Sequence, residues 1–99
     1  MCNIFAGIPR ESYECQTRSV RLSGHSTSIR LEAVYWDLLE QLADSQSLSL
    51  GRLLTELHDE VLDLHGEARN FTSLLRCVCL VHLQRSGATP LRALEAARG

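Results

Sequence analysis

The chain has 99 residues, of which 44% are hydrophobic and 22% are charged. This composition is that of one ordinary globular domain, and it excludes a chain that is mainly disordered. The N-terminus shows no basic segment followed by a long apolar run, and no apolar run approaches the roughly 18 residues of a membrane span. We therefore expect a cytoplasmic protein without membrane contact.

The charges are unevenly distributed along the chain. Residues 1–31 hold four arginines and two glutamates, residues 32–67 hold one arginine and nine acidic residues, and residues 68–99 hold five arginines and one glutamate. The net charge of −2 argues against strong nonspecific binding to nucleic acid, because such binding depends on neutralising phosphates. The arginine-rich ends still allow a local basic face.

Two short strands are expected near the N-terminus. Residues 1–17 show no regular period and are expected to form an N-terminal arm. Residues 18–31 alternate polar and apolar side chains, a period typical of strands with one buried face. Ser23-Gly24 interrupts the alternation, which predicts a turn or bulge between two strands.

Three helices are expected after the strands. Residues 32–45 carry a continuous apolar stripe at helical spacing. Residues 46–49 connect this helix to a second amphipathic helix, for which Ser49 is the expected N-cap and Gly66 the C-terminal stop. A third helix follows and ends at Gly87. Its apolar residues occur nearly all round the helix, so we expect it to be largely buried.

The order of these elements predicts the fold. A small ribbon beside two amphipathic helices leaves strand edges open, and the simplest partner is the same strand of a second copy related by a two-fold axis. We predict a mainly α protein with a short β-ribbon. It is a ribbon-helix-helix domain with an added third helix over residues 18–87, followed by a short tail or helix at 88–99. The expected state is an intertwined homodimer in which neither copy is stable alone, with a dimer core of Ile29, Leu31, Leu38, Leu53 and Leu57.

Three segments of the sequence resemble a known bacterial family. They are Thr27-Ser28-Ile29-Arg30-Leu31-Glu32 followed by Tyr35-Trp36, the preceding Arg18-Ser19-Val20-Arg21, and the later Asn70-Phe71-Thr72-Ser73-Leu74-Leu75-Arg76. Over about residues 2–84 the chain resembles small, mostly uncharacterised ribbon-helix-helix proteins of the Arc/MetJ-like superfamily. The resemblance implies the fold above and DNA binding through the β-ribbon. The N-terminal arm, the third helix and the net negative charge depart from the best-studied repressors of this fold.

A defined set of residues is expected to contact DNA. If Ile29 and Leu31 face the core, Ser26, Ser28 and Arg30 face outward, where arginine can bond guanine bidentately and serine can bond either base edge. The expected phosphate contacts are Arg21 and His25 near the ribbon turn, together with Ser49, Leu50 and Gly51 at the start of the second helix. The expected function is a transcriptional regulator that recognises a pseudo-palindromic site in double-stranded DNA. The alternative is a dimeric protein-interaction module that does not bind DNA.

Catalytic chemistry has little support in the sequence. There is no phosphate-binding glycine loop, nucleophile elbow or dinucleotide motif. His58, Asp59, Asp63 and His65 lie on or near one predicted helix, but their spacing is not that of a known metal site, and a solvated helix face explains them better. The four cysteines form no zinc-finger pattern with the histidines. We therefore expect no catalytic site, no metal and no cofactor.

Overall fold

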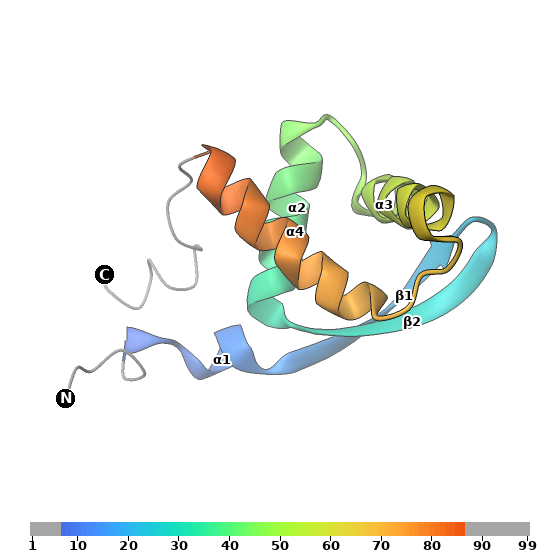
Figure 1. Ribbon diagram of the computed structural model, residues 1–99. Helices are drawn as coiled ribbons and strands as arrows, with labels where there is room; N and C mark the ends of the chain where they lie inside the picture. The colour runs from blue at the N-terminus through green and yellow to red at the C-terminus, as the bar shows by residue number, and fades with distance from the viewer. Residues whose placement is uncertain (1–6, 87–99) are drawn as a thin grey trace.

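The computed structural model describes residues 7–86 of the chain, so the predicted end of the third helix at Gly87 and the tail at 88–99 lie outside the described residues. Two strands and four helices follow one another along this part of the chain (Figure 1). No helix among residues 7–86 is long and apolar enough to cross a membrane. The elements are α1 (Arg10–Tyr13), β1 (Cys15–Leu22), β2 (His25–Glu32), α2 (Ala33–Ser45), α3 (Leu50–His65) and α4 (Phe71–Ser86).

The predicted strands are confirmed as an antiparallel hairpin joined by a two-residue turn. Ser23 and Gly24 form the turn with φ of 52° and 86°, the left-handed conformation at both central positions that suits a tight hairpin. The ladder runs from the pair Leu22–His25 at the turn to the pair Cys15–Glu32 at the open end. β1 thus begins three residues before the predicted strand. The sequence shows no apolar alternation over residues 15–17, and backbone pairing alone extends the strand there.

β1 and β2 pair with each other within one chain, through the turn at Ser23-Gly24. A two-stranded hairpin still has two outer edges, so the expected pairing with a second copy stays a prediction. The pairing continues one step past the strands, where the Ala33 N–H donates to the Glu14 carbonyl over 2.9 Å. On β1, the Thr55 hydroxyl of α3 donates to the outward-pointing carbonyl of Arg21 over 3.0 Å and so satisfies part of that edge.

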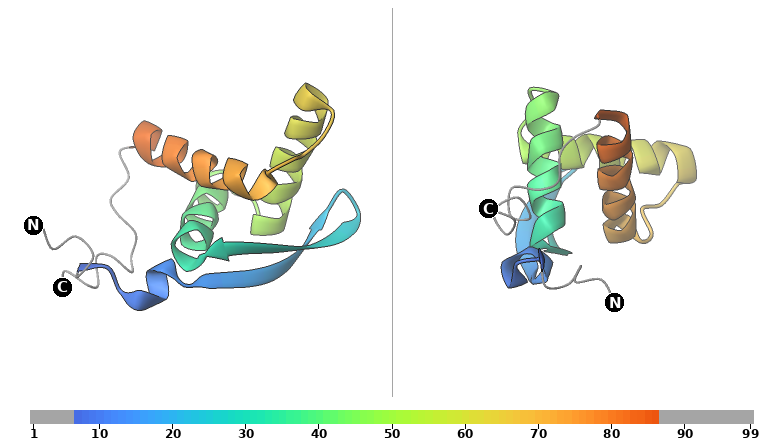
Figure 2. Two further views of the ribbon diagram at one scale, coloured as in Figure 1. Left: turned by 60° about the horizontal axis from the view of Figure 1, so that its bottom comes forward. Right: turned by 90° about the vertical axis from the view of Figure 1, so that its left-hand side faces the viewer.

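The helices α2, α3 and α4 lie together on one face of the ribbon (Figure 2). The predicted caps of α3 are confirmed. The Ser49 hydroxyl accepts the N–H of Arg52 over 3.1 Å at the start of the helix. Gly66 ends it in the left-handed conformation, with its N–H bonded to the Leu62 carbonyl over 2.8 Å. The architecture is therefore two layers, a hairpin and a helical layer, with the apolar side chains between them.

The core is formed by both strands and by α2, α3 and α4. Of the five residues expected in a dimer core, four are already buried within the single chain, while Leu57 is only partly covered. Their role in a dimer core stays a prediction. The buried apolar residues are Leu22, Ile29, Leu31, Trp36, Leu38, Leu39, Ala43, Leu53, Leu54, Leu75 and Cys79.

Helix α4 is much less buried than its composition predicted. Leu80 is 54% exposed, Val81 is 41% exposed, and Cys77 also lies on the surface. Within one chain the helix is not largely buried, because α4 packs mainly on α2 and makes fewer contacts with β2. An apolar face of α4 is therefore left uncovered by the residues described.

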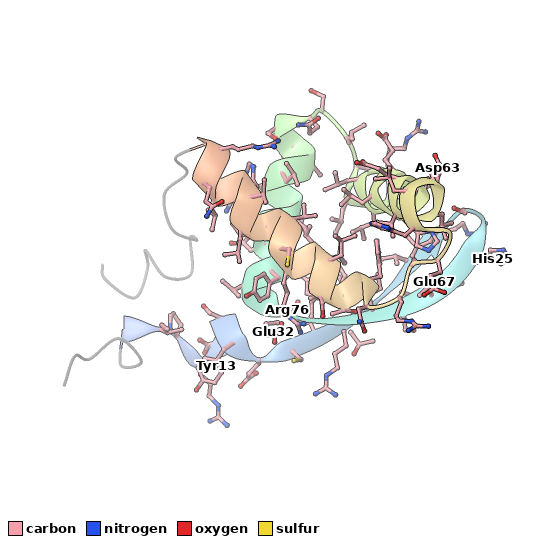
Figure 3. The ribbon with its side chains drawn as sticks, viewed as in Figure 1. Tyr13, His25, Glu32, Asp63, Glu67 and Arg76 are labelled. Atoms are coloured by element: carbon pink, nitrogen blue, oxygen red, sulfur yellow. The ribbon has the colours of Figure 1, made fainter. Side chains whose placement is uncertain are left out.

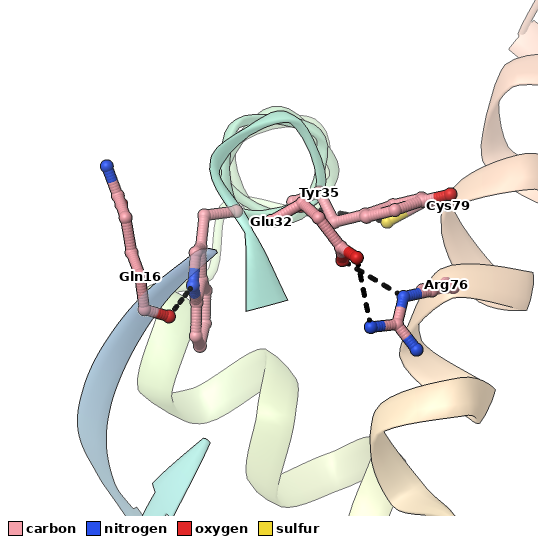
Figure 4. A network of polar contacts seen from close by, with 6 residues as sticks. Gln16, Glu32, Tyr35, Arg76 and Cys79 are labelled. Carbon is pink, nitrogen blue, oxygen red and sulfur yellow. Dashed lines mark hydrogen bonds and ion pairs between the residues drawn. The ribbon is translucent and has the colours of Figure 1, made fainter. Parts of the chain in front are cut away.

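An ion pair fastens α4 to the end of the ribbon. The Arg76 guanidinium donates to both carboxylate oxygens of Glu32 over 3.0 and 3.3 Å and lies 5.7 Å from the Tyr35 ring centre (Figure 4). Partial burial by itself would raise the pKa of Glu32, but the hydrogen bonds and positive charge of Arg76 outweigh it and hold that pKa below its usual value. The charged pair thus stabilises the fold at neutral pH.

The Glu32–Arg76 pair makes stability depend on pH. Since the folded pKa of Glu32 lies below the unfolded value near 4.5, its stabilisation is complete above that value and disappears as the pH falls through the lower folded pKa. Glu32→Gln should lower the free energy of unfolding by about 1 kcal/mol at pH 7, because the pair is only partly screened by solvent. Urea unfolding of both proteins at pH 7 and pH 3 checks this. The prediction would be contradicted if the difference in free energy of unfolding between wild type and Glu32→Gln were as large at pH 3 as at pH 7, or larger.

Candidate nucleic-acid interface

The face of the ribbon opposite the helices is polar and exposed. Alternation in the hairpin directs every second side chain of each strand to this side, away from the inner residues Leu22, Ile29 and Leu31. Cross-strand pairing then places arginine or serine opposite a small hydroxyl side chain. We call this surface the outer ribbon face; its residues are Thr17, Ser19, Arg21, Ser26, Ser28 and Arg30, all of which are exposed. The three residues predicted to contact bases, Ser26, Ser28 and Arg30, lie side by side on it.

The two arginines of the outer ribbon face are available for a ligand. Elsewhere in residues 7–86, five arginines bind carboxylates within the chain, at distances of 2.9–3.4 Å. Arg21 and Arg30 have no carboxylate partner among the described residues, and both are exposed. A guanidinium without an internal carboxylate keeps all its donors free for phosphate or for a base edge.

The acidic residues of the middle segment lie mainly in the helical layer. Residues 33–65 form α2 and α3, which pack on the inner side of the ribbon, and no acidic side chain occurs among the six residues of the outer ribbon face. The negative charge concentrated in this part of the sequence is therefore displaced from the polar surface of the strands. A duplex placed against that surface meets the two arginines first.

The predicted phosphate contacts at the turn lie close to the outer ribbon face. Arg21 is paired with Ser26 and belongs to the face itself. His25 is exposed at the tip of the hairpin (Figure 3), but its strand position directs it to the inner side, opposite Leu22. Arg21 can therefore contact a ligand on the outer ribbon face, whereas His25 is directed to the opposite side of the hairpin.

The predicted phosphate contacts of the second helix lie in different surroundings. Ser49 and Leu50 line a hollow of about 320 Å³ together with Glu40 and Asp44, and Gly51 is exposed next to them. The two carboxylates oppose the charge of a phosphate at this helix start. The structure does not bring these three residues onto the outer ribbon face.

Two residues of the outer ribbon face were missed by the sequence interpretation. Thr17 lay in the predicted arm, and Ser19 was assigned to a strand without a role. The hairpin register brings Thr17 opposite Arg30 and Ser19 opposite Ser28. Only the register shows this, although the alternation of Ser19 and Arg21 with apolar residues was the available signal.

His58 and Cys79 pack against neighbouring side chains of the fold rather than forming a reactive site. The His58 ring packs edge-on against Phe71 with ring centres 5.2 Å apart. Within residues 7–86, no group of three or more histidine, cysteine, aspartate or glutamate side chains is placed to hold a metal ion. Burial raises the pKa of the Cys79 thiol to about 12, so this cysteine is not a nucleophile at neutral pH.

Comparisons with known proteins agree with this architecture. Residues 15–83 match the ribbon-helix-helix domain family. Among solved structures, the chain is similar to an uncharacterized protein from Bordetella pertussis Tohama I, with a TM-score of 0.79 and 44% sequence identity, over 94% of this chain and 76% of that one. No curated protein matches the chain. The hairpin followed by α2, α3 and α4, together with the match over residues 15–83, places this chain in the ribbon-helix-helix domain family.

Proposed function

We propose that this protein is a homodimeric DNA-binding regulator that recognises duplex DNA with its outer ribbon face. The family to which it belongs is generally one of DNA-binding transcriptional regulators rather than enzymes. The observation that carries the proposal is the pair of exposed arginines without carboxylate partners among the described residues, set among small hydroxyl side chains. The one carboxylate of the two strands, Glu32, is already bonded to Arg76. A two-stranded ribbon fits the major groove, which is about 12 Å wide.

The chemistry of the outer ribbon face suits base recognition. Arg30 can bond O6 and N7 of a guanine, and the hydroxyls of Ser26 and Ser28 can donate to or accept from neighbouring base edges. The helix start at Ser49 is left out of this proposal, because Glu40 and Asp44 share its hollow.

The dimer is proposed to form through the helices. Two adjoining hollows, of about 510 and 250 Å³, lie along α4 against α2 and α3 and share Leu74 and Val78 in their linings. Val81 is 41% and Leu64 70% exposed, which is costly for apolar side chains in one chain and favours association. We call this surface the apolar groove; its residues are Leu57, Val61, Leu64, Leu74, Val78 and Val81.

A second copy of the chain is the proposed occupant of the apolar groove. A two-fold axis brings the same surface of each copy together, so each apolar helix face covers the other. Glu60 lines both hollows, while Arg85 lines one and Arg69 the other, so opposite charges border the contact and can pair between copies. Because β1 and β2 pair within each chain, this dimer needs no exchange of strands.

The test is a selection of binding sites from random duplex DNA at a stated salt concentration, since protein–DNA affinity depends steeply on salt. The wild-type protein should enrich a defined motif. Arg30→Ala should bind that motif more weakly, by roughly a hundredfold or more, because the dimer loses two bidentate contacts to guanine of about 1–3 kcal/mol each. Circular dichroism of Arg30→Ala serves as the folding control. If the wild-type protein enriches no motif, DNA recognition is wrong, and the alternative of a protein-interaction dimer replaces it.

A further inference from the structure

The two strands of the hairpin carry nearly the same sequence. β1 contains Ser19-Val20-Arg21-Leu22 and β2 contains Ser28-Ile29-Arg30-Leu31, nine residues later. Serine, arginine and leucine repeat identically, and valine replaces isoleucine, another β-branched residue. Before the serines, Arg18 of β1 corresponds to Thr27 of β2, and Thr17 corresponds to Ser26. The ribbon is thus built from two copies of one short pattern.

The register turns this repeat into a local two-fold symmetry. Ser19 and Ser28, which are equivalent in the repeat, are also directly paired across the ladder. An axis between these serines, perpendicular to the ribbon, therefore superimposes each strand on the other. It exchanges the pair Arg21–Ser26 with the pair Arg30–Thr17, so that each arginine faces a small hydroxyl side chain from the other strand.

The symmetry holds on both sides of the ribbon. On the inner side, Leu22 and Leu31 are equivalent and are 4% and 0% exposed. On the outer side, Arg21 and Arg30 are both exposed and both lack an ion-pair partner among the described residues. The repeat is broken where Gln16 stands for His25 and where Arg18 stands for Thr27. Arg18 has a separate role, 4.8 Å above the Trp36 ring and paired with Glu40.

The spacing of the two arginines matches a short DNA element. Arg21 lies opposite Ser26, four residues from Arg30 along the ribbon, which corresponds to about 13 Å at roughly 3.3 Å per residue. That length is equivalent to about three or four base-pair steps. Because the local axis can coincide with a dyad of the duplex, equivalent arginines meet guanines on opposite strands of the DNA.

We propose, on the basis of the proposed function, that the hairpin of a single chain recognises a short inverted repeat by itself, with Arg21 and Arg30 as equivalent base-contacting residues in its two arms. Ser19 and Ser28 then lie over the centre of the element. Arg21, which the sequence suggested as a phosphate contact, takes the same role as Arg30. A dimer joined through the apolar groove carries two such hairpins, and its complete site contains two of these elements.

The experiment compares four proteins in the same selection from random duplex DNA: wild type, Arg21→Ala, Arg30→Ala and the double variant. Wild type should enrich an inverted repeat with a guanine in each arm. Each single variant should keep one arm of each element and lose the preference at the other. Both should bind the wild-type motif more weakly by the same factor, roughly a hundredfold or more, since the dimer loses two contacts. The double variant should enrich no motif.

Arg52→Ala is the matched control, because it removes the same charge from an exposed position of α3 in the helical layer. It should preserve both arms. If Arg21→Ala also preserves both arms while Arg30→Ala does not, the internal symmetry has no part in recognition, although DNA binding itself remains supported. If wild type enriches no motif at all, both proposals are wrong. Unchanged thermal unfolding of each variant separates loss of contact from loss of fold.

Discussion

Ile29→Asp is expected to unfold the protein at neutral pH. Ile29 is 4% exposed on the inner side of β2, where it packs in the core between the ribbon and the helices. Loss of the buried side chain costs about 2–5 kcal/mol, and an unpaired carboxylate in an apolar site costs several kcal/mol more. The total reaches the whole stability of a typical small domain, about 5–15 kcal/mol. Far-ultraviolet circular dichroism should show loss of the helical signal.

Ser28→Asp is the matched control for this variant. It introduces the same carboxylate one residue earlier, where the side chain is exposed on the outer ribbon face. The control should keep its helical signal and a cooperative thermal transition, because its charge stays in water. Equal behaviour of the two variants, whether both fold or both unfold, would show that the inner and outer sides of β2 are wrongly assigned.

Val81→Asp is expected to convert the proposed dimer into a folded monomer. In the apolar groove the new carboxylate loses its water against a second copy, which costs about 3 kcal/mol or more, and an ion pair with Arg85 in the same hollow offsets only part of this. Dimerisation should therefore weaken roughly a hundredfold or more. In one chain Val81 is 41% exposed, so the monomer itself tolerates the change. Sedimentation equilibrium over a range of concentrations measures the effect.

Leu80→Asp controls for the general effect of an acidic residue on α4. Leu80 is 54% exposed but does not line either hollow of the apolar groove. This variant should remain as dimeric as the wild type. Dissociation by Leu80→Asp with no effect of Val81→Asp would move the interface to the other side of α4, and a wild type that is monomeric at all concentrations would remove the dimer altogether.

The fold was largely predictable because its elements carry simple local signals. Alternation over residues 18–31 predicted the strands, and Ser49 and Gly66 correctly marked the ends of α3. The start of β1 was not predictable, since residues 15–17 are all exposed and carry no apolar pattern. The exposure of α4 was also missed, because the apolar residues of a helix do not show which other element, if any, packs against them.

The sequence predicted the contribution of β2 to the outer ribbon face but not that of β1. Period two identified the outward side chains of β2, which gave Ser26, Ser28 and Arg30. The contribution of β1 depends on the register of the hairpin, and that register is set by the two-residue turn at Ser23-Gly24. A shift of one residue would have turned Ser19 and Arg21 to the inner side. The acidic surroundings of Ser49 depend likewise on tertiary packing, which brings Glu40 and Asp44 beside it.

The direct junction of ribbon and helix has a mechanical consequence. β2 ends at Glu32 and α2 begins at Ala33, so no flexible residue separates them, and Arg76 ties the same point to α4. The hairpin and the helices are therefore expected to turn as one body. In the proposed complex with DNA, an effector that rotated the helical layer would tilt the ribbon against the duplex without altering its side chains. Such an effector would lower the affinity for all DNA sequences in proportion, and leave the order of preference among them unchanged.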